Sequence, residues 1–248
     1  FLLLDHIGPG HLQPSSRRKG VHEHPHRGFE TVTIVYAGEV EHRDSTGMGG
    51  IIRAGDVQWM TAAGGILHEE FFSEDFTQRG GRFELVQLWV NLPAANKMDA
   101  PAYQGLASTD IPTHVLPDGA GSIRVIAGHF ADAAGPALTH TRMNILDVQM
   151  RAGHEAIFAT EAGDTALVFL RSGRLQFAPD EQLEVDGMAV MSSREADFAL
   201  TALEESHFLV LTGAPINEPI NGHGPFVMNT YEEVLQAFED LKQGRLGT

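Results

Sequence analysis

Two pairs of potential metal ligands occur in the sequence, and in each pair one position separates the two residues. His24 and His26 form the first pair, and His68 and Glu70 form the second. In an extended strand, residues i and i+2 point to the same face. Each pair can therefore direct two side chains at one point, and two neighbouring strands can bring all four together. Three neutral imidazoles and one carboxylate suit iron, copper, nickel, manganese or zinc better than calcium.

A single His-x-His pair is common in proteins that bind no metal, so only the two pairs together indicate a metal site. Each pair adjoins a strand-like run with a glycine turn, and a β-meander would bring the two runs side by side. We therefore expect a metal site on a β-sandwich, with coordination positions left open for a small molecule. His22 is in phase with His24 and His26, but Pro25 disturbs the strand there and a third ligand would be crowded. We expect His22 to lie at the rim.

The segments around these pairs have the composition of short strands separated by glycine turns. Residues 5–20, rich in Gly, Pro, Ser and Arg, indicate a loop, and residues 91–112, with three prolines, indicate a linker. Short strands at regular spacing without a helical period predict an all-β sandwich or barrel. The strands expected in this half are 31–36, 39–42, 51–52, 57–60 and 82–92.

The second half of the chain repeats this pattern weakly, which predicts a duplicated domain. It has no paired histidines and no His-x-Glu, so we expect it to be structural and to bind no metal. We place the metal-binding domain at 1–104 and the degenerate domain at 105–248. The corresponding segments of the second half are 152–156, 165–170, 174–177, 183–191 and 197–200.

The end of the chain predicts one helix. Thr230 and Glu233 have the spacing of a capping box, and Gly244 provides the stop. We expect the apolar stripe between them to belong to the core, packed across a sheet or between the domains. The stripe consists of Val234, Leu235, Phe238 and Leu241.

The composition excludes several classes of protein. A formal net charge of −16 argues against direct binding to nucleic acid or to an anionic membrane. The absence of cysteine excludes disulfide frameworks and thiol catalysis, and fits the cytoplasm. No apolar run is long enough to span a bilayer, and residues 1–4 are too short for a signal sequence. The sequence starts without methionine, so it leaves open whether an N-terminal segment is missing.

Four segments of the sequence resemble the pirin family, a branch of the cupin superfamily. They are His-Pro-His-Arg-Gly-Phe-Glu-Thr (24–31), Gly-Asp-Val-Gln-Trp-Met-Thr-Ala (55–62), Gly-Ile-Leu-His-Glu-Glu (65–70) and Gly-His-Gly-Pro-Phe-Val-Met-Asn-Thr (222–230). The resemblance covers nearly the whole chain. It implies two tandem cupin barrels (double-stranded β-helix, or jelly-roll) with a C-terminal α-helix.

The resemblance also implies a cofactor and an activity. The family's metal positions correspond to His24, His26, His68 and Glu70, and imply iron, with copper, nickel, manganese, cobalt or zinc as alternatives. Some members resemble quercetin 2,3-dioxygenases, which implies a flavonol-like substrate and O2, with loss of carbon monoxide on ring opening. A vertebrate member is described as a nuclear cofactor of transcription factors, which implies a protein partner. Unlike general cupins, pirins are not expected to use the glutamate at Glu30 as a ligand, and they supply Glu70 instead.

Other roles follow as hypotheses. We expect Glu70 to act both as ligand and as proton acceptor. Glu30 is a candidate acceptor for a ligand imidazole N–H, or else an ion-pair partner of Arg27 or Arg53. A flat substrate would need apolar walls, and the candidates, which also suit a core, are Phe29, Trp59 and Met60.

Three functions compete. The first is a dioxygenase acting on a flavonol or similar enol, and the second is a non-catalytic metal-sensing module that binds a regulatory protein or an enzyme. The third, a zinc-dependent sugar isomerase, is the weakest because no Lys/Arg cluster beyond Arg27 lies near the ligands to hold a sugar phosphate. The open metal positions favour catalysis, and the acidic surface is compatible with a basic protein partner.

Overall fold

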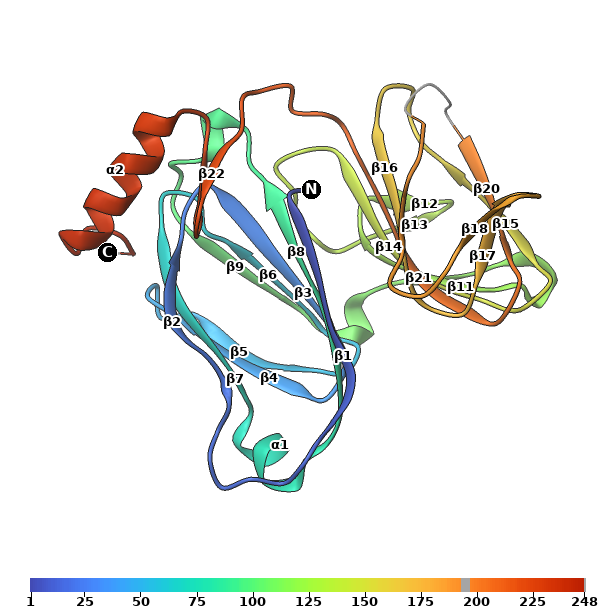
Figure 1. Cartoon of the computed structure of the whole chain (residues 1–248), viewed down its shortest axis with the longest axis horizontal. Coiled ribbons are helices and arrows are strands. Elements are labelled where there is room, and N and C mark those ends of the chain that lie inside the picture. The colour runs from blue at the N-terminus through green and yellow to red at the C-terminus, as the bar shows by residue number, and fades with distance from the viewer. Residues whose placement is uncertain (193–196, 248) are drawn as a thin grey trace. The chain divides into compact units, whose positions relative to one another are not determined.

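A computed structural model describes residues 1–192 and 197–247 of the 248-residue chain (Figure 1). Its contacts divide the chain into two compact units. The first unit contains Phe1–Ser108 and Asn217–Thr248, and the second contains Thr109–Ile216. The expected division was 1–104 and 105–248. The structure therefore places the C-terminal segment with the first unit, where the sequence analysis had assigned it to the second domain.

The first unit is a sandwich of two antiparallel sheets, as the alternating strand pattern predicts (Figure 1). One sheet has the order β1 (Leu3–Leu12), β8 (Gly81–Asn91), β3 (Phe29–Ala37), β6 (Val57–Thr61) and β9 (Ala102–Leu106). The other has the order β2 (Gly20–His26), β7 (Ile66–Phe72), β4 (Glu39–Asp44) and β5 (Gly49–Arg53). The five strands expected in this half are all present.

Two segments predicted as irregular are strands. Residues 3–12 form β1, which pairs with β8 at the edge of the larger sheet. The pairing register shifts between Ile7 and Gly10, so Pro9 falls at an irregularity on an edge strand, where proline is tolerated. Inside the expected linker, β9 pairs with β6 and completes the same sheet. A short helix that was not predicted, α1 (Glu74–Arg79), connects β7 to β8 and is capped by Ser73.

One end of the sandwich interior is apolar. Buried side chains from β3, β4, β5, α1 and β8 pack together there. Burial of such side chains is the main favourable term in folding, about 25 cal/mol per Å² of apolar surface. The members of this cluster are Val35, Val40, Ile52, Phe76, Phe83 and Leu85.

The C-terminal segment joins the first unit through the hairpin of β22 (Asn221–His223) and β23 (Phe226–Met228) and through helix α2 (Tyr231–Lys242). The predicted capping box is confirmed: Thr230 Oγ1 accepts from Glu233 N–H, and the Glu233 carboxylate accepts from Thr230 N–H. Arg27, 4% exposed, forms an ion pair with Asp240 at 2.8 Å and donates to the carbonyl of Gly64. These contacts hold the helix on the first unit.

Lys97 makes a second connection to the same segment. It follows the short turn η1 (Ala94–Asn96) and is 1% exposed. Its Nζ donates to the carbonyl of Gly28 at 2.6 Å, to Asn91 Oδ1 at 2.7 Å and to the carbonyl of Val227 at 2.9 Å. Burial lowers the pKa of Lys97 to about 8, opposed by the charges of nearby glutamates. One buried ammonium thus connects β8, the start of β3 and β23.

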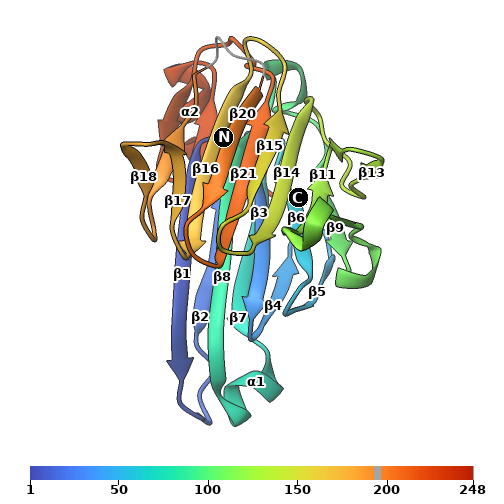
Figure 2. The same cartoon turned by 90° about the vertical axis from the view of Figure 1, so that its right-hand side faces the viewer.

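The second unit is also a pair of antiparallel sheets, whose strands β11, β14, β21 and β16 are seen in Figure 2. One sheet has the order β10 (Thr113–Val115), β11 (Gly121–Ala127), β14 (Met143–Met150), β21 (Ser206–Gly213), β16 (Thr165–Ser172) and β19 (Met188–Val190). The other has the order β15 (Glu155–Ala159), β20 (Asp197–Ala202), β17 (Leu175–Ala178) and β18 (Glu181–Leu183). A two-stranded ribbon consists of β12 (His129–Phe130) and β13 (Ala133–Ala134), and the remaining short turns are η2 (Ser108–Asp110) and η3 (Pro117–Gly119). The all-β prediction with a C-terminal helix is confirmed.

The part of the chain that the structure describes contains no helix that is both long and apolar enough to cross a membrane.

Candidate metal centre

Three of the four predicted ligands converge in the first unit. His24 and His26 on β2 lie directly opposite His68 and Ile66 on β7, so the two imidazoles of β2 face the imidazole of His68. The ring centroids of His24 and His68 are 4.2 Å apart, and those of His26 and His68 are 5.0 Å apart. One ligand atom from each ring lies within 4.8 Å of the others. The i, i+2 spacing of His24 and His26 therefore places both rings beside His68, and the binding of a metal by these residues stays a prediction.

Backbone carbonyls orient two of these rings. His24 Nδ1 lies 2.8 Å from the carbonyl of His22, and His26 Nδ1 lies 3.4 Å from the carbonyl of Pro225. A carbonyl only accepts, so each Nδ1 carries the proton and each Nε2 keeps a lone pair for a metal. Pro225 belongs to the C-terminal segment, which therefore contributes to the site.

Burial keeps two rings of the cluster, His26 and His68, uncharged. Burial first, and the neighbouring His24 second, lower the pKa of His26 to about 3. Burial likewise lowers the pKa of His68 far below its ordinary value, with further contributions from His24, His26 and His42. Neutral imidazole is the form that binds metal. His26 and His68 are 5% and 2% exposed, while His24 is half-buried, so solvent reaches the cluster from the side of His24.

Glu70 is held beside the cluster. Its Oε1 accepts from Gln58 Nε2 and its Oε2 accepts from Gln87 Nε2, both at 3.1 Å. The two glutamines come from β6 and β8 of the opposite sheet. By distance, Glu70 groups with His68 and with a further histidine, His42, again within 4.8 Å. Each carboxylate oxygen retains a second lone pair that can meet an ion or a proton.

The residues present fit a transition metal. His68 Nε2 is buried and has no hydrogen-bond partner among residues 1–192 and 197–247. An unpaired nitrogen of this kind is costly to bury unless something binds it. Three imidazoles with an adjacent carboxylate are the donor set that borderline first-row ions prefer. Both candidate groups in the described residues lie in the first unit.

One aromatic side chain near the cluster, Trp89, was not predicted from the sequence. Trp89 stacks on Phe29 at 4.2 Å and meets the ring of His26 edge-on at 5.4 Å. Trp89 is half-buried, so part of its side chain beside His26 is accessible to solvent. Phe29, Trp59 and Met60 are all fully buried, and Trp59 points to the opposite face of β6 from Met60. Of these three expected wall residues, Trp59 cannot line the site.

Glu30 and His22 belong to neither of the two candidate metal-binding groups among the described residues. Glu30 accepts from Thr61 Oγ1 at 2.7 Å on the face of β3 opposite Phe29, so it is not the acceptor for a ligand imidazole. That role belongs to the carbonyls of His22 and Pro225. The side chain of His22 is exposed, and its ring lies against Phe71.

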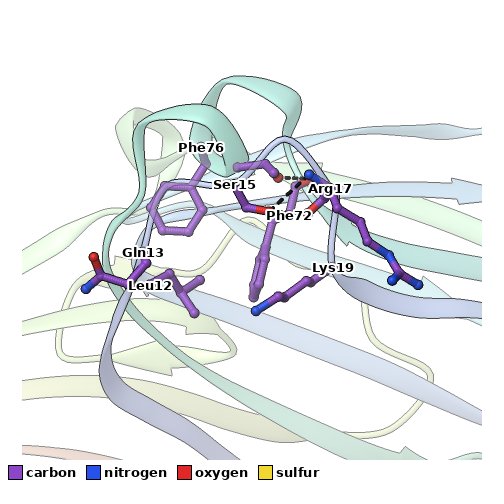
Figure 3. Close-up of a pocket in the computed structure, with 8 residues that line it drawn as sticks. Leu12, Gln13, Ser15, Arg17, Lys19, Phe72 and Phe76 are labelled. Carbon is purple, nitrogen blue, oxygen red and sulfur yellow. Dashed lines mark hydrogen bonds between the residues drawn. The ribbon is translucent and has the colours of Figure 1, made fainter.

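A separate pocket lies at the end of β7 that leads into α1 (Figure 3). Phe72 and Phe76 form its apolar wall, and Arg17 and Lys19 reach along its edge. Its lining has no histidine and no carboxylate, so it offers no metal ligands. The complete lining is Leu12, Gln13, Ser15, Arg17, Lys19, Phe72, Phe76 and Thr77.

Comparison with known proteins identifies relatives over the whole chain. Residues 1–90 match the family model described as Pirin, and residues 145–247 match the model described as Pirin C-terminal cupin domain. A Pseudomonas aeruginosa protein whose name provisionally assigns it quercetin 2,3-dioxygenase activity is 52% identical over 245 residues, or 99% of this chain and 85% of that protein. Human pirin is 36% identical over 254 residues, covering 100% of this chain and 82% of pirin.

Solved structures of related proteins have the same fold as this chain. The crystal structure of a quercetin 2,3-dioxygenase from Acinetobacter baumannii matches with a TM-score of 0.97 at 48% identity, covering 100% of this chain and 86% of that chain. A bacterial pirin from Escherichia coli, solved in complex with nickel(II), shares the fold with a TM-score of 0.63 at 20% identity, over 86% of this chain and 80% of that chain. The expected pair of cupin domains is therefore confirmed.

Proposed function

Because the chain belongs to the pirin family of cupin proteins, we propose that it is a metal-dependent dioxygenase that opens flavonols such as quercetin with O2. The observation that carries the proposal is the convergence of the imidazoles of His24, His26 and His68, in which the buried His68 Nε2 lacks a partner among the described residues. The solved quercetin 2,3-dioxygenase at 48% identity supports the same reaction class.

In this proposal, His24, His26, His68 and Glu70 hold one divalent transition metal, with iron as the first candidate. Such an ion supplies Lewis acidity toward a hydroxyl group and redox chemistry toward dioxygen. We infer iron from the resemblance, and the donor set itself also accepts nickel, copper, manganese, cobalt or zinc.

The side chains around the ligands have separate tasks. His26 and His68, buried beneath the half-exposed His24, exclude water from the inner side of the site. The Trp89 ring offers a flat face to an aromatic guest that enters beside His24. A Glu70 oxygen takes the proton of the substrate's hydroxyl group, while Gln58 and Gln87 keep the carboxylate in place.

The test is turnover of quercetin by the iron-loaded protein under air. We expect loss of the flavonol's visible absorbance together with release of carbon monoxide, each in proportion to the O2 consumed. The control is the double variant His24→Ala, His68→Ala, which removes two imidazoles from the cluster. Equal rates for both proteins would eliminate the enzyme function.

A non-catalytic module that senses metal and binds a regulatory protein or an enzyme is the second candidate. The net charge of −16 favours a basic partner, and human pirin at 36% identity has a name that states no enzyme activity. Metal binding without quercetin turnover, in protein that is folded and fully loaded, would support this candidate over the dioxygenase.

A further inference from the structure

A third pair of residues with i, i+2 spacing lies beside the proposed metal site. On β4, Asp44 lies opposite His68 and His42 lies opposite Glu70, and both side chains are completely buried. We propose that Asp44 and His42 form a hydrogen-bond chain that fixes the tautomer of His68 and directs its Nε2 to the metal. The inference rests on the proposed metal site and makes Asp44 and His42 positioning residues for it.

The atoms of the chain define where each proton sits. Asp44 Oδ2 lies 3.1 Å from His42 Nε2, and His42 Nδ1 lies 3.4 Å from His68 Nδ1. A carboxylate only accepts, so His42 Nε2 carries a proton and Nδ1 of the neutral ring keeps a lone pair. Neutral His68 has one proton, which it must place on Nδ1 to donate to His42. Its Nε2 is then left with a lone pair, the state that a metal requires.

Other residues of the first unit restrict the orientation of Asp44 and His42. Asp44 Oδ1 accepts from Thr46 N–H at 2.9 Å, from Thr46 Oγ1 at 2.6 Å and from Met48 N–H at 3.2 Å. These donors keep Oδ1 in the turn and leave Oδ2 for His42. Tyr103 stacks on the His42 ring at 5.1 Å with an interplanar angle of 23°, which limits rotation of the imidazole.

Substituting Asp44 with asparagine would reverse the direction of the hydrogen bonds that connect residues 44, 42 and 68. The side-chain volume would hardly change. The turn donors require an oxygen at the Oδ1 position, so the amide nitrogen must face His42. That nitrogen donates, which makes His42 Nε2 an acceptor and moves the His42 proton to Nδ1. His68 must then accept at Nδ1 and carry its own proton on Nε2. The proton would occupy the position that the metal needs.

His42 could instead be a ligand, because it groups with His68 and Glu70 within 4.8 Å. The hydrogen bond between its Nε2 and Asp44, and the approach of its Nδ1 to the Nδ1 of His68, favour the positioning role. The two roles predict different effects when His42 is substituted. A ligand needs a nitrogen lone pair, whereas the chain needs only an acceptor at the Nδ1 position.

The first experiment measures Co(II) affinity by competition with a chelator for the full-length wild type, Asp44→Asn, His42→Phe and His42→Asn. We expect Asp44→Asn and His42→Phe to bind about 10–100-fold more weakly. His42→Asn, whose Oδ1 can accept from His68, should lie closer to wild type than His42→Phe does. If His42 served only for packing, the ring of phenylalanine would be the better substitute. Wild-type affinity in Asp44→Asn would overturn the proposal.

Asp56→Asn is the matched control. Like Asp44, Asp56 lies in a turn of the first unit and accepts hydrogen bonds from backbone N–H groups. Its Oδ2 accepts from Arg53 N–H at 3.0 Å and its Oδ1 accepts from Ser108 N–H at 2.8 Å. We expect its Co(II) affinity to equal that of wild type. Urea unfolding of each metal-free variant checks the fold. If Asp44→Asn does not fold, the order of His42→Asn and His42→Phe still decides the matter.

The second experiment records hyperfine-shifted proton NMR signals of the Co(II)-loaded proteins. We expect exchangeable N–H signals from His24, His26 and His68, with the His68 signal lost or broadened by exchange in His42→Phe. An additional coordinated imidazole that disappears in His42→Phe would identify His42 as a ligand and refute the positioning role. Failure of wild type to bind Co(II) would refute the proposed function as well. Wild-type binding that His24→Ala abolishes but Asp44→Asn leaves intact would refute this inference alone.

Discussion

The buried ammonium of Lys97 gives a quantitative test of how the C-terminal segment is held. In Lys97→Met, a side chain of similar length replaces the lysine but donates no hydrogen bond. The carbonyls of Gly28 and Val227 and the amide oxygen of Asn91 would each lose a donor at 2.6–2.9 Å. Unsatisfied buried acceptors cost about 2 kcal/mol each, or about 6 kcal/mol for three.

Part of this cost is offset. Burial lowers the pKa of Lys97 from 10.5 to about 8, which means that burying the charge costs about 3 kcal/mol that methionine avoids. The net loss of unfolding free energy is therefore about 3 kcal/mol. With a urea dependence of about 2 kcal/mol per M, the unfolding midpoint should fall by about 1.5 M.

Tryptophan fluorescence is the appropriate assay. The chain has two tryptophans, Trp59 and Trp89, and both lie in the first unit, so the signal reports that unit alone. The control is Lys242→Met, the same change at an exposed position on α2, for which we expect a shift below about 0.5 kcal/mol. Equal midpoints for Lys97→Met and wild type would show that the three acceptors do not depend on the ammonium.

Four further outcomes follow. Because burial holds the pKa of His26 at about 3, below its ordinary 6.5, the unfolded state takes up the proton first on acidification. His26 alone should account for a loss of about 4 kcal/mol in the unfolding free energy of the metal-free protein as pH falls from 6.5 toward 3, and His26→Gln should remove this part of the pH dependence in urea titrations. Arg27→Met should leave Asp240 without its buried partner and speed proteolysis of the C-terminal segment. Arg245→Met, which removes the exposed partner of Asp240, is the control. Equal cleavage rates for the two variants would contradict the role of Arg27. Gly28→Ala should fold poorly, because φ is +89° and a Cβ would meet the Val227 carbonyl at 1.9 Å; soluble expression against Gly47→Ala, at φ +82° but in open space, checks this. Gln58→Leu with Gln87→Leu should release Glu70 and weaken Co(II) affinity about 10-fold, which chelator competition measures against Gln104→Leu.

The sequence predicted the strands that neighbour the histidine pairs, and the face that each pair shares, because both signals are local. The β-branched run at 31–36 and the i, i+2 spacing of His24 with His26 depend only on strand geometry. The strand β1 was missed because edge pairing tolerates Gly8, Pro9 and Gly10, which otherwise indicate a loop. His42 and Asp44 had the same spacing as the ligand pairs, so the sequence contained a signal for them that pattern reading did not use.

Other features of the site depend on contacts between distant residues, which periodicity cannot predict. Gln58 and Gln87 reach Glu70 from the opposite sheet, and which polar residues meet across a sandwich depends on sheet packing. Trp89 lies in a strand that is apolar on both faces, so its orientation toward His26 could not be read from alternation.

The C-terminal segment shows why a division by sequence similarity differs from a division by contacts. The family model for the C-terminal cupin domain extends through residue 247, yet residues 217–248 pack with the first unit. There the carbonyl of Pro225 orients His26, and the carbonyl of Val227 accepts from Lys97. The chain beyond residue 216 therefore completes the surroundings of His26, a proposed ligand. If the proposed metal site exists, Pro225 orients one of its ligands, so we expect metal affinity and the docking of this segment to be thermodynamically linked.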